Sequence, residues 1–423
     1  MAQVGAPNSG VTEADVLVVG GGPAGAATAY HLARHGVDVL VVDKSSFPRE
    51  KVCGDGLAPR GVAALLAMGV DPTEPGFERV DGLRVHGDGV SLELPWPALA
   101  TFPSYGVVRT RHDLDHVLLQ RAEKAGARVW ERSEAVDPIV EDRWVRGAGI
   151  LRGERDDHRE RLDVRARFVI AADGASSRFA GRAGVRRDPT RPLGIAARRY
   201  FRSPHDTAGM FESWLNLWDG SRLLPGYGWI FPVGDGVLNV GAGLLNTYQA
   251  FRDVSARRVF DLFLQQLPPE WELTEEHAAG PLLSGPLPMG MNRRPLSMPG
   301  LLVVGDAGGA VNPFNGEGIA YAMESGELAA ELLHDALVTG RAGVVQLYGA
   351  EMRRRYGRYY ALGRAFVRAI GRPWVMRAAT RYGLPRRRFM AFLLRLMANL
   401  SDGKDGDAED RIMAALVRLA PEG

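Results

Sequence analysis

Two side chains suited to proton transfer lie close together near residue 54. Cys53 is the only cysteine of the 423-residue chain, and Asp55 follows it across Gly54. A thiol or a carboxyl group held beside a reacting atom can act as a general acid. Each residue also has a structural alternative, since a free cysteine is commonly a small buried side chain and Asp55 can cap a helix from Leu57 onward.

A glycine motif near the N-terminus marks the strand–helix–strand unit that precedes Cys53 and Asp55 in the chain and must position them. Residues 16–19 form an apolar run typical of a strand buried on both faces, and Gly-x-Gly-x-x-Gly follows at residues 20–25. A small-residue helical stretch ends at Gly36, and a second apolar run ends at Asp43. This order of strand, glycine turn, helix, strand and acid predicts a dinucleotide site.

Each position of that motif has a physical task. Gly20 permits the tight turn, Gly22 lets the backbone approach a pyrophosphate, and Gly25 lets the helix pack closely on the strand. The helix that starts at residues 23–24 (Pro23, Ala24) has free N–H groups at its N-terminus for the phosphates, beginning at Ala24 because proline has no N–H. Asp43 is placed to accept hydrogen bonds from a ribose.

A second glycine-rich motif distinguishes FAD from NAD. An apolar run at residues 301–304 precedes Gly-Asp-Ala-Gly, and residues 312–318 lead into a helical stretch. An acid at the strand end suits the ribityl hydroxyls of a flavin, and the next helix N-terminus would point at the flavin pyrimidine edge. The alternative is one more strand, turn and helix of the same sheet. The predicted flavin contacts are Asp306, Gly316, Gly318 and Ile319.

The composition excludes several classes of protein. The chain has 52 Lys+Arg and 50 Asp+Glu, a balance that argues against a dedicated nucleic-acid binder. A lone cysteine forbids an internal disulfide and fits a cytosolic compartment. The polar N-terminus predicts no signal peptide, and no uninterrupted apolar run reaches the roughly 20 residues that span a bilayer.

Four motifs in order resemble a flavoprotein superfamily that includes aromatic hydroxylases, flavin halogenases and geranylgeranyl reductases. They are GGGPAG at 20–25, RHDLD at 111–115, ADGASS at 172–177 and GDAGGAVNPFNGEG at 305–318. The resemblance implies a bound FAD and an α/β fold in which a Rossmann-like FAD-binding domain is interleaved with a β-rich substrate domain. It also implies that Arg111 contacts the FAD. No metal is expected.

Two further segments resemble the geranylgeranyl reductase family, whose members saturate carbon–carbon double bonds in isoprenoid chains. They are KVCGDGL at 51–57 and YGWIFP at 227–232, the latter followed by Gly-Ala-Gly at 241–243. Residues 394–405 resemble the actinobacterial branch thought to act on menaquinone side chains. Halogenases carry a related WxWxIP signature together with a catalytic lysine, but this chain has no lysine between residues 125 and 403.

The resemblance and the motifs together define the expected site. Cys53 and Asp55 are the predicted catalytic residues, and hydride from N5 of the reduced flavin would require a water-excluding slot. Tyr227, Trp229 and Phe231 alternate, so they share one strand face that suits an isoprenoid chain; the alternative is a sandwich core that binds nothing. Gly241 and Gly243 complete the predicted substrate contacts. Lys44, Cys53, Gly54, Asp55 and Ala135 complete the predicted cofactor contacts.

Three rival functions remain open at this stage. One is a geranylgeranyl diphosphate or phospholipid reductase, for which Arg198, Arg199 and Arg202 are candidates to clamp a diphosphate. Another is an FAD-dependent aromatic monooxygenase or halogenase. The last is a lipid carrier with a redox-silent flavin. Because no second Gly-x-Gly-x-x-Gly unit is visible, the electron donor stays unidentified among transient NAD(P)H, a ferredoxin and another reductase.

The C-terminal region is strongly basic. Residues 351–400 contain thirteen arginines and one acid, Glu351, interleaved with aromatic and aliphatic residues. This pattern predicts short helices that bind an anionic membrane surface, which places the protein peripherally on the cytoplasmic side of the cell membrane. The alternative is a solvated arginine face over the FAD domain. The predicted domains are FAD-binding (1–80, 106–185, 286–345), substrate-binding (81–105, 186–285) and C-terminal basic helical (346–423).

Overall fold

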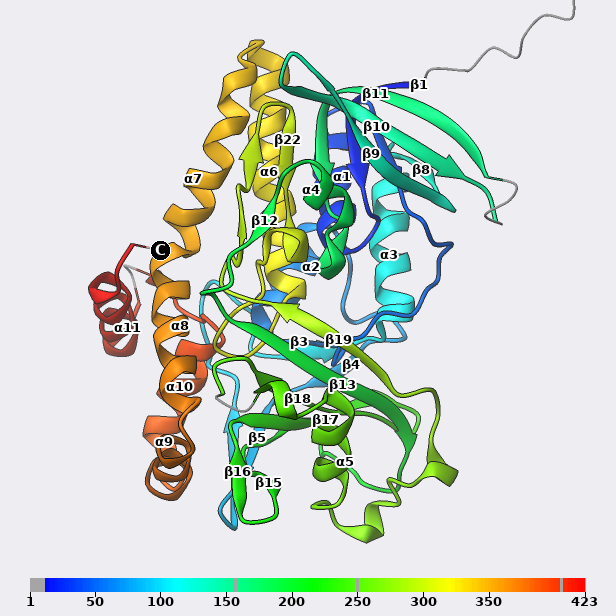
Figure 1. The fold of residues 1–423 in the computed structure, drawn as a ribbon. Helices are drawn as coiled ribbons and strands as arrows, with labels where there is room; N and C mark the ends of the chain where they lie inside the picture. Colours follow the sequence, from blue (N-terminus) through cyan, green and yellow to red (C-terminus); the bar gives the residue numbers. More distant parts are fainter. Residues whose placement is uncertain (1–11, 155–158, 249–250, 404–405, 423) are drawn as a thin grey trace, which may run out of the picture.

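Two large β-sheets, each with helices against it, make up most of the molecule (Figure 1). The computed structural model describes residues 12–154, 159–248, 251–403 and 406–422. The first sheet occupies the upper part of Figure 1, the second sheet the lower part, and the C-terminal helices run along one side of both. The predicted α/β class with a C-terminal helical segment is confirmed.

The first sheet has the parallel core expected of a dinucleotide-binding fold. β1 (Thr12–Val19) pairs in parallel with β2 (Val39–Val42) and β11 (Glu160–Ala171), and β11 pairs in parallel with β22 (Leu301–Val303). Val16 and Val18 of β1 face one apolar cluster and Leu17 and Val19 face another, which is why the strand is apolar throughout. The strand order is β21 (Ser297–Met298), β22 (Leu301–Val303), β11 (Glu160–Ala171), β1 (Thr12–Val19), β2 (Val39–Val42) and β8 (Arg128–Trp130), with β9 (Ser133–Glu141) and β10 (Trp144–Arg152) attached beside β11.

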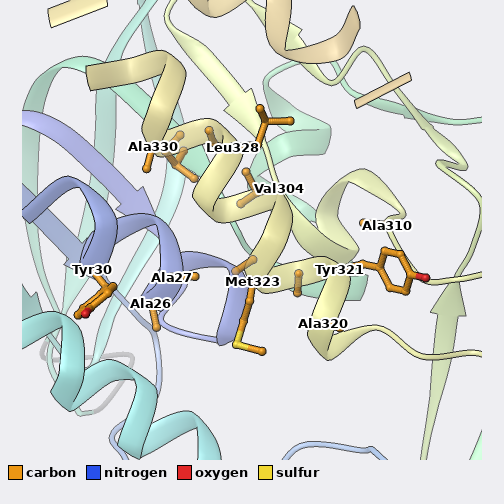
Figure 2. Packing of buried hydrophobic residues seen from close by; sticks show 14 of the residues in the cluster. Ala26, Ala27, Tyr30, Val304, Ala310, Ala320, Tyr321, Met323, Leu328 and Ala330 are labelled. Atoms are coloured by element: carbon orange, nitrogen blue, oxygen red, sulfur yellow. The ribbon is translucent and has the colours of Figure 1, made fainter. Parts of the chain in front are cut away.

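Helices α1 (Pro23–Ala33) and α6 (Ile319–Thr339) pack side by side on this sheet. Figure 2 shows Ala26 and Ala27 of α1 beside Met323 of α6. Small residues allow this approach, because a Cβ on Gly326 would lie 2.5 Å from the Ala24 carbonyl oxygen. The two glycine motifs, nearly 300 residues apart in the sequence, therefore meet at one end of the sheet. The neighbouring helices are α2 (Pro59–Ala67), α3 (Arg111–Lys124) and α4 (Arg178–Arg182).

The second sheet presents one face to a helix and the other to the first half of the molecule. Ile230 and Val240 pack with Phe263 of α5 (Ala256–Leu264) in one apolar cluster. The opposite face carries Tyr200, Trp229 and Asn239, which contact one another or the segment around Cys53. The strand order is β19 (Leu283–Pro288), β13 (Leu193–Arg202), β18 (Val237–Leu245), β17 (Gly226–Gly234), β14 (Met210–Trp214), β5 (Gly82–Gly87) and β6 (Val90–Pro95).

Short strands join these larger units. A small sheet orders β3 (Gly56–Leu57), β7 (Gly106–Val108) and β4 (Glu78–Val80), and two-stranded pairs form from β12 (Arg186–Arg187) with β20 (Arg293–Arg294) and β15 (Leu217–Asp219) with β16 (Arg222–Leu224). The second sheet mixes strands from residues 82–95 with strands from residues 193–288, as an interleaved architecture requires. The domain boundaries given above stay a prediction.

The C-terminal region is a chain of short helices interrupted by two π-helical turns at Arg353–Gly357 and Ala379–Gly383. Asp407 and Asp410 form a capping box that starts the last helix at Ala408. Lys404 and Asp405 lie outside the described residues. In the described parts of the chain, no helix is long and apolar enough to cross a membrane. The helices are α7 (Tyr348–Met352), α8 (Arg358–Ile370), α9 (Pro373–Ala378), α10 (Arg387–Met397) and α11 (Ala408–Leu419).

Candidate active site

The turn between β1 and α1 is a cradle that side chains would fill. Gly20 has φ +106, and a Cβ there would lie 2.4 Å from the Ala172 carbonyl oxygen. A Cβ on Gly25 would lie 1.8 Å from the Gly20 carbonyl oxygen. At Gly22, by contrast, the nearest atom is Nη2 of Arg49 at 3.5 Å. Gly20 and Gly25 thus allow the tight turn and the helix packing, while Gly22 leaves space beside a cationic side chain, as a pyrophosphate needs.

Asp43 braces this turn from the end of β2. Its Oδ2 accepts a hydrogen bond from the Gly21 N–H at 2.8 Å, and its Oδ1 accepts one from the Ser45 N–H at 2.9 Å. The Ser133 N–H donates to the Asp43 carbonyl oxygen, and Ala135 follows two residues later on β9. Lys44 is exposed. Asp43 and Ala135 therefore lie at the same end of the cradle, whereas no interaction ties Lys44 to it among the described residues.

Cationic side chains surround the cradle. Arg111 donates from Nε and Nη2 to the two oxygens of Asp115 at 2.6 and 2.8 Å, and Arg49 lies 3.1 Å from Asp115. Burial lowers the pKa of Lys51, with further lowering from Arg111 and Arg49, while Asp306 raises it. A bound phosphate would relieve this repulsion, so the cradle fits an anionic cofactor. Arg49 and Lys51 were not among the predicted cofactor contacts. The sequence feature that could have indicated them is the presence of two basic residues in the loop after Asp43.

The carboxyl group of Asp306 faces the second glycine motif. A Cβ on Gly318 would lie 3.4 Å from Asp306 Oδ1, so the end of β22 and the start of α6 adjoin. Burial raises the pKa of Asp306, and Lys51, Arg111 and Arg293 oppose the rise. No described residue donates a hydrogen bond to this carboxyl group, which leaves it available for the ribityl hydroxyls of a flavin.

Asp55 is a hub between the two halves of the molecule. The residue is fully buried, and its carboxylate accepts hydrogen bonds from the Arg111 N–H at 3.1 Å, the Tyr200 hydroxyl at 2.5 Å and Nδ2 of Asn239 at 2.7 Å. The alternative that Asp55 caps the following helix is wrong, because α2 begins at Pro59 after Ala58 and has no side-chain cap. Asp55 instead accepts a hydrogen bond from the N–H of Arg111, the first residue of α3.

Cys53 lies against the opposite sheet. Its carbonyl oxygen accepts a hydrogen bond from Nδ2 of Asn239 at 2.9 Å. Burial raises the pKa of its thiol, and the Arg111 charge only partly opposes the rise. The thiol is therefore protonated at neutral pH. A Cβ on Gly54 would lie 3.1 Å from the Phe231 ring, so residues 53–56 pass close over the aromatic strand.

Tyr227, Trp229 and Phe231 form the predicted aromatic wall. Ring centroids are 5.9 Å apart for the first pair and 6.4 Å apart for the second, on one face of β17. A Cβ on Gly241 would lie 2.1 Å from the Trp229 ring, so Gly241 is needed for indole packing, and Gly243 pairs with Tyr227 across the strands. The Tyr227 hydroxyl donates to the Asn315 carbonyl oxygen at 2.8 Å. The wall thus spans from residues 53–56 to residues 312–318.

Comparison with known proteins identifies the family that carries this arrangement. Residues 13–200 match the family model described as FAD binding domain. The chain is 35% identical over 401 residues to menaquinone reductase of Mycobacterium tuberculosis (strain ATCC 25618 / H37Rv), an alignment that covers 94% of each chain. The chain belongs to the geranylgeranyl reductase family of FAD-dependent oxidoreductases. It is also 31% identical over 362 residues to digeranylgeranylglycerophospholipid reductase of Thermoplasma acidophilum, covering 85% and 86% of the two chains.

Solved structures agree with this family assignment. A geranylgeranyl bacteriochlorophyll reductase-like protein of Thermoplasma acidophilum superposes with a TM-score of 0.79 at 26% identity, covering 96% of this chain and all of that one. A flavin-dependent brominase superposes with a TM-score of 0.71 at 19% identity, a likeness that shows the fold alone. FAD is thus the cofactor, as predicted, and the halogenase or monooxygenase alternative has less support than a reductase.

The three arginines considered for a diphosphate clamp do not come together in this reductase. Arg198 is buried and donates to Glu50 at 2.8 Å and to the Lys51 carbonyl oxygen at 3.1 Å. Arg199 contacts the Gly280 carbonyl oxygen and Glu275 instead, and Arg202 is exposed. Strand alternation on β13 places Arg199 on the opposite face from Arg198 and Arg202, and these two are separated by four residues along the strand.

One acid of this reductase was not among the predicted site residues. Glu317 lies between Gly316 and Gly318, and both of its carboxyl oxygens are buried without a hydrogen-bond partner among the described residues. The signal was an acid inside a glycine-rich flavin motif, but sequence alone did not show that it is buried.

Proposed function

We propose that this protein saturates a carbon–carbon double bond in a polyprenyl chain, namely the isoprenoid side chain of menaquinone. The observation that carries the proposal is the aromatic wall, which lies between residues 53–56 and residues 312–318, which include predicted flavin contacts. An apolar surface beside the flavin suits an isoprenoid substrate. The relative named menaquinone reductase, which aligns over 94% of this chain, supports menaquinone among polyprenyl substrates.

The residues of the chain bind, orient and shield in this reaction. Gly22, Arg49 and Arg111 would hold the FAD phosphates, Asp306 the ribityl group, and residues 316–319 the ring. When bound and reduced, the flavin supplies a hydride. The aromatic wall holds the alkene and excludes water. Asp55 fixes residues 53–56 against β13 and β18, so the Cys53 thiol keeps one position beside the wall.

Lipid mass spectrometry tests the proposed substrate. We would compare isoprenoid lipids from a menaquinone-producing host that carries the wild type, Cys53→Ala or an empty vector. We expect a two-hydrogen mass gain that fragmentation places in the menaquinone side chain. A gain confined to polyprenyl phosphates or ether lipids would favour the geranylgeranyl diphosphate or phospholipid alternative. No gain in any isoprenoid, with yellow protein and a competent electron donor present, would contradict a prenyl reductase.

We also propose that the protein docks peripherally on the cytoplasmic face of the cell membrane through part of its C-terminal region. Aromatic residues of the first half of that region do not serve this purpose, because they are buried. Tyr356 and Tyr360 pack against Tyr321 of α6, and Tyr359 packs against Phe314. This half therefore agrees better with the alternative of a cover over the FAD domain.

The second half of the C-terminal region, from Arg372 onward, offers a different surface. Trp374, Tyr382 and Phe389 are 64%, 59% and 50% exposed. No acidic residue occurs between Glu351 and Asp402. On the other side of these helices, Leu384, Met390 and Leu394 join the cluster that contains Phe211 and contacts Phe231. The surface suits anionic lipid and adjoins the substrate wall. Its exposed arginines are Arg372, Arg377, Arg381, Arg386, Arg387 and Arg388.

Vesicle sedimentation tests this docking surface. The triple variant Trp374→Ala, Tyr382→Ala, Phe389→Ala should lose roughly tenfold or more of its affinity for phosphatidylglycerol-containing vesicles, because three aromatic anchors no longer enter the interface. The matched control replaces three exposed apolar residues elsewhere, Leu66, Val140 and Val338, and should bind normally. Equal binding by both triple variants would contradict the proposed surface.

A further inference from the structure

Glu317 is a buried acid whose carboxyl group makes no ion pair or well-formed hydrogen bond with the described residues. It lies in the tight turn of residues 312–318, where the Asn312 N–H donates to the Glu317 carbonyl oxygen at 2.8 Å and the Glu317 N–H donates to Asn315 Oδ1 at 3.0 Å. The backbone is thus fixed on both sides. Its two carboxyl oxygens have no hydrogen-bond partner in the described chain. Leaving such a group buried is costly unless it performs a task.

Arg60 provides the largest compensating charge for the Glu317 carboxylate. Arg60 donates to Glu324 Oε1 at 2.7 Å and to the Asn399 carbonyl oxygen at 2.9 Å, while its Nε is buried without a partner. Burial raises the pKa of Glu317 to about 7. The Arg60 charge opposes the rise, as do the nearby Ala58 N–H and Asn315 side chain, and the Glu324 charge adds to it. The group is therefore poised to gain and lose a proton near neutral pH, and Arg60 lies close enough to stabilise the carboxylate form.

The position of Glu317 places it beside the predicted reaction space. Gly316 and Gly318, its two neighbours, are predicted flavin contacts. The Tyr227 hydroxyl donates a hydrogen bond to the carbonyl oxygen of Asn315, two residues before Glu317. Burial raises the pKa of Tyr227 to about 12, and the charges of Cys53 and Glu317 both add to the rise. Tyr227 thus lies within electrostatic reach of both groups and stays neutral.

We propose that Glu317 is the acid that supplies the proton consumed when the alkene is saturated, an inference that rests on the proposed reductase function. One alkene carbon takes the hydride that the reduced cofactor provides. The other carbon takes the proton from the Glu317 carboxyl group. The π bond and the O–H bond break as two C–H bonds form. The resulting carboxylate faces the Arg60 charge and regains its proton from solvent.

The other two candidate acids are less well suited. Burial raises the pKa of Asp55, but the Tyr200 hydroxyl, Nδ2 of Asn239 and the Arg111 N–H oppose the rise. All three hydrogen-bond to this carboxyl group and favour its ionised, accepting form. The Cys53 thiol has its pKa raised above the ordinary 9.0, which makes it a weaker acid than Glu317 at neutral pH. Cys53 then shapes the slot beside the wall, and Glu317 delivers the proton.

Two measurements on FAD-loaded protein test the inference. Isotope-edited infrared spectroscopy with 13C-labelled glutamate follows the protonated carboxyl band against pH. We expect a band that disappears with a midpoint near pH 7 in the wild type and is absent in Glu317→Gln. The matched control is Glu327→Gln, which removes a partly buried acid farther along α6 and should keep the band of Glu317.

Rapid-quench mass spectrometry gives the second readout. Protein reduced with dithionite is mixed with menaquinone in detergent, and side-chain saturation is measured by fragmentation, because the quinone head itself accepts electrons. Glu317→Gln should keep its flavin content and slow saturation by roughly 100-fold or more. Glu317→Asp keeps a carboxyl group on a side chain one carbon shorter, so its saturation rate should fall between those of the wild type and Glu317→Gln. Glu327→Gln should match the wild type.

The failure of this inference differs from the failure of the proposed function. Unchanged saturation in Glu317→Gln, or no carboxyl group that titrates near pH 7, would overturn Glu317 as the donor while the reductase function stands. A wild type that saturates no isoprenoid chain would overturn both, even if the infrared midpoint is found. If Glu317→Gln lacks flavin, Glu317→Asp takes its place. The midpoint of its carboxyl band and its saturation rate then decide whether residue 317 is the proton donor.

Discussion

Asp55 and Glu317 are buried carboxyl groups at the two ends of the same aromatic wall, yet their surroundings are opposite. Asp55 accepts three hydrogen bonds, from α3, β13 and β18. Glu317 receives none from the described residues. A carboxylate surrounded by donors holds distant elements together, whereas one without partners is free to change its protonation. The pair therefore separates a structural acid from a chemical one within a single site.

The largest effect that can break this contrast is expected at Asp55. Asp55→Asn keeps the shape but turns an acceptor oxygen into an N–H donor that faces other donors. Because the site is fully buried, we expect a loss of about 4 kcal/mol in the free energy of unfolding. Urea denaturation measures it. A loss below about 1 kcal/mol would show that Asp55 does not join the two halves.

The same chemical change at Glu317 should act in the other direction. Its folded-state pKa, about 7, lies above the ordinary 4.5, so the folded protein holds the proton more tightly than the unfolded chain does. Stability is therefore lost as pH rises from about 4.5 to 7. Glu317→Gln removes this penalty and should be more stable than the wild type by about 3 kcal/mol at pH 8, with no difference near pH 4.

Thermal unfolding between pH 4 and pH 8 measures this difference in the FAD-loaded protein. Glu327→Gln again serves as the control on the same helix. A Glu317→Gln variant that is less stable than the wild type at pH 8 would mean that Glu317 has a hydrogen-bonding role like that of Asp55.

The smallest effect is expected at Tyr227, which connects the wall to the turn that carries Glu317. Tyr227→Phe removes one hydrogen bond to the Asn315 carbonyl oxygen and should cost about 1 kcal/mol of stability. Flavin content should stay normal. Amide hydrogen exchange over residues 312–318 should rise, because the turn loses its link to β17; unchanged exchange there would show that the turn is held by its own contacts alone.

The cofactor cradle could be predicted because its parts are neighbours in the sequence. Residues 20–25 and Asp43 belong to one strand, turn, helix and strand unit, and the spacing of the glycines carries the geometry. The aromatic wall was also predictable, since alternation along one strand places Tyr227, Trp229 and Phe231 on one face.

The partners of Asp55 could not be predicted in the same way. Tyr200 and Asn239 lie 145 and 184 residues away, and only the pairing of β13 with β18 brings them together. In the C-terminal region, Tyr359 and Tyr382 belong to the same interleaved pattern, but one is buried and the other is 59% exposed. Neither amino-acid composition nor the spacing of apolar residues distinguishes the buried tyrosine from the exposed one, because tertiary packing decides which face of each helix is covered.

The pH dependence of side-chain saturation decides whether Glu317 is the proton donor. Rapid-quench product analysis would compare wild type and Glu317→Gln, both FAD-loaded and chemically reduced, between pH 5.5 and pH 8.5. If Glu317 supplies the proton, the wild-type rate falls about tenfold per pH unit above pH 7, where Glu317 loses its proton, and Glu317→Gln is slow at every pH. The same declining profile in both proteins, at similar rates, would contradict this assignment.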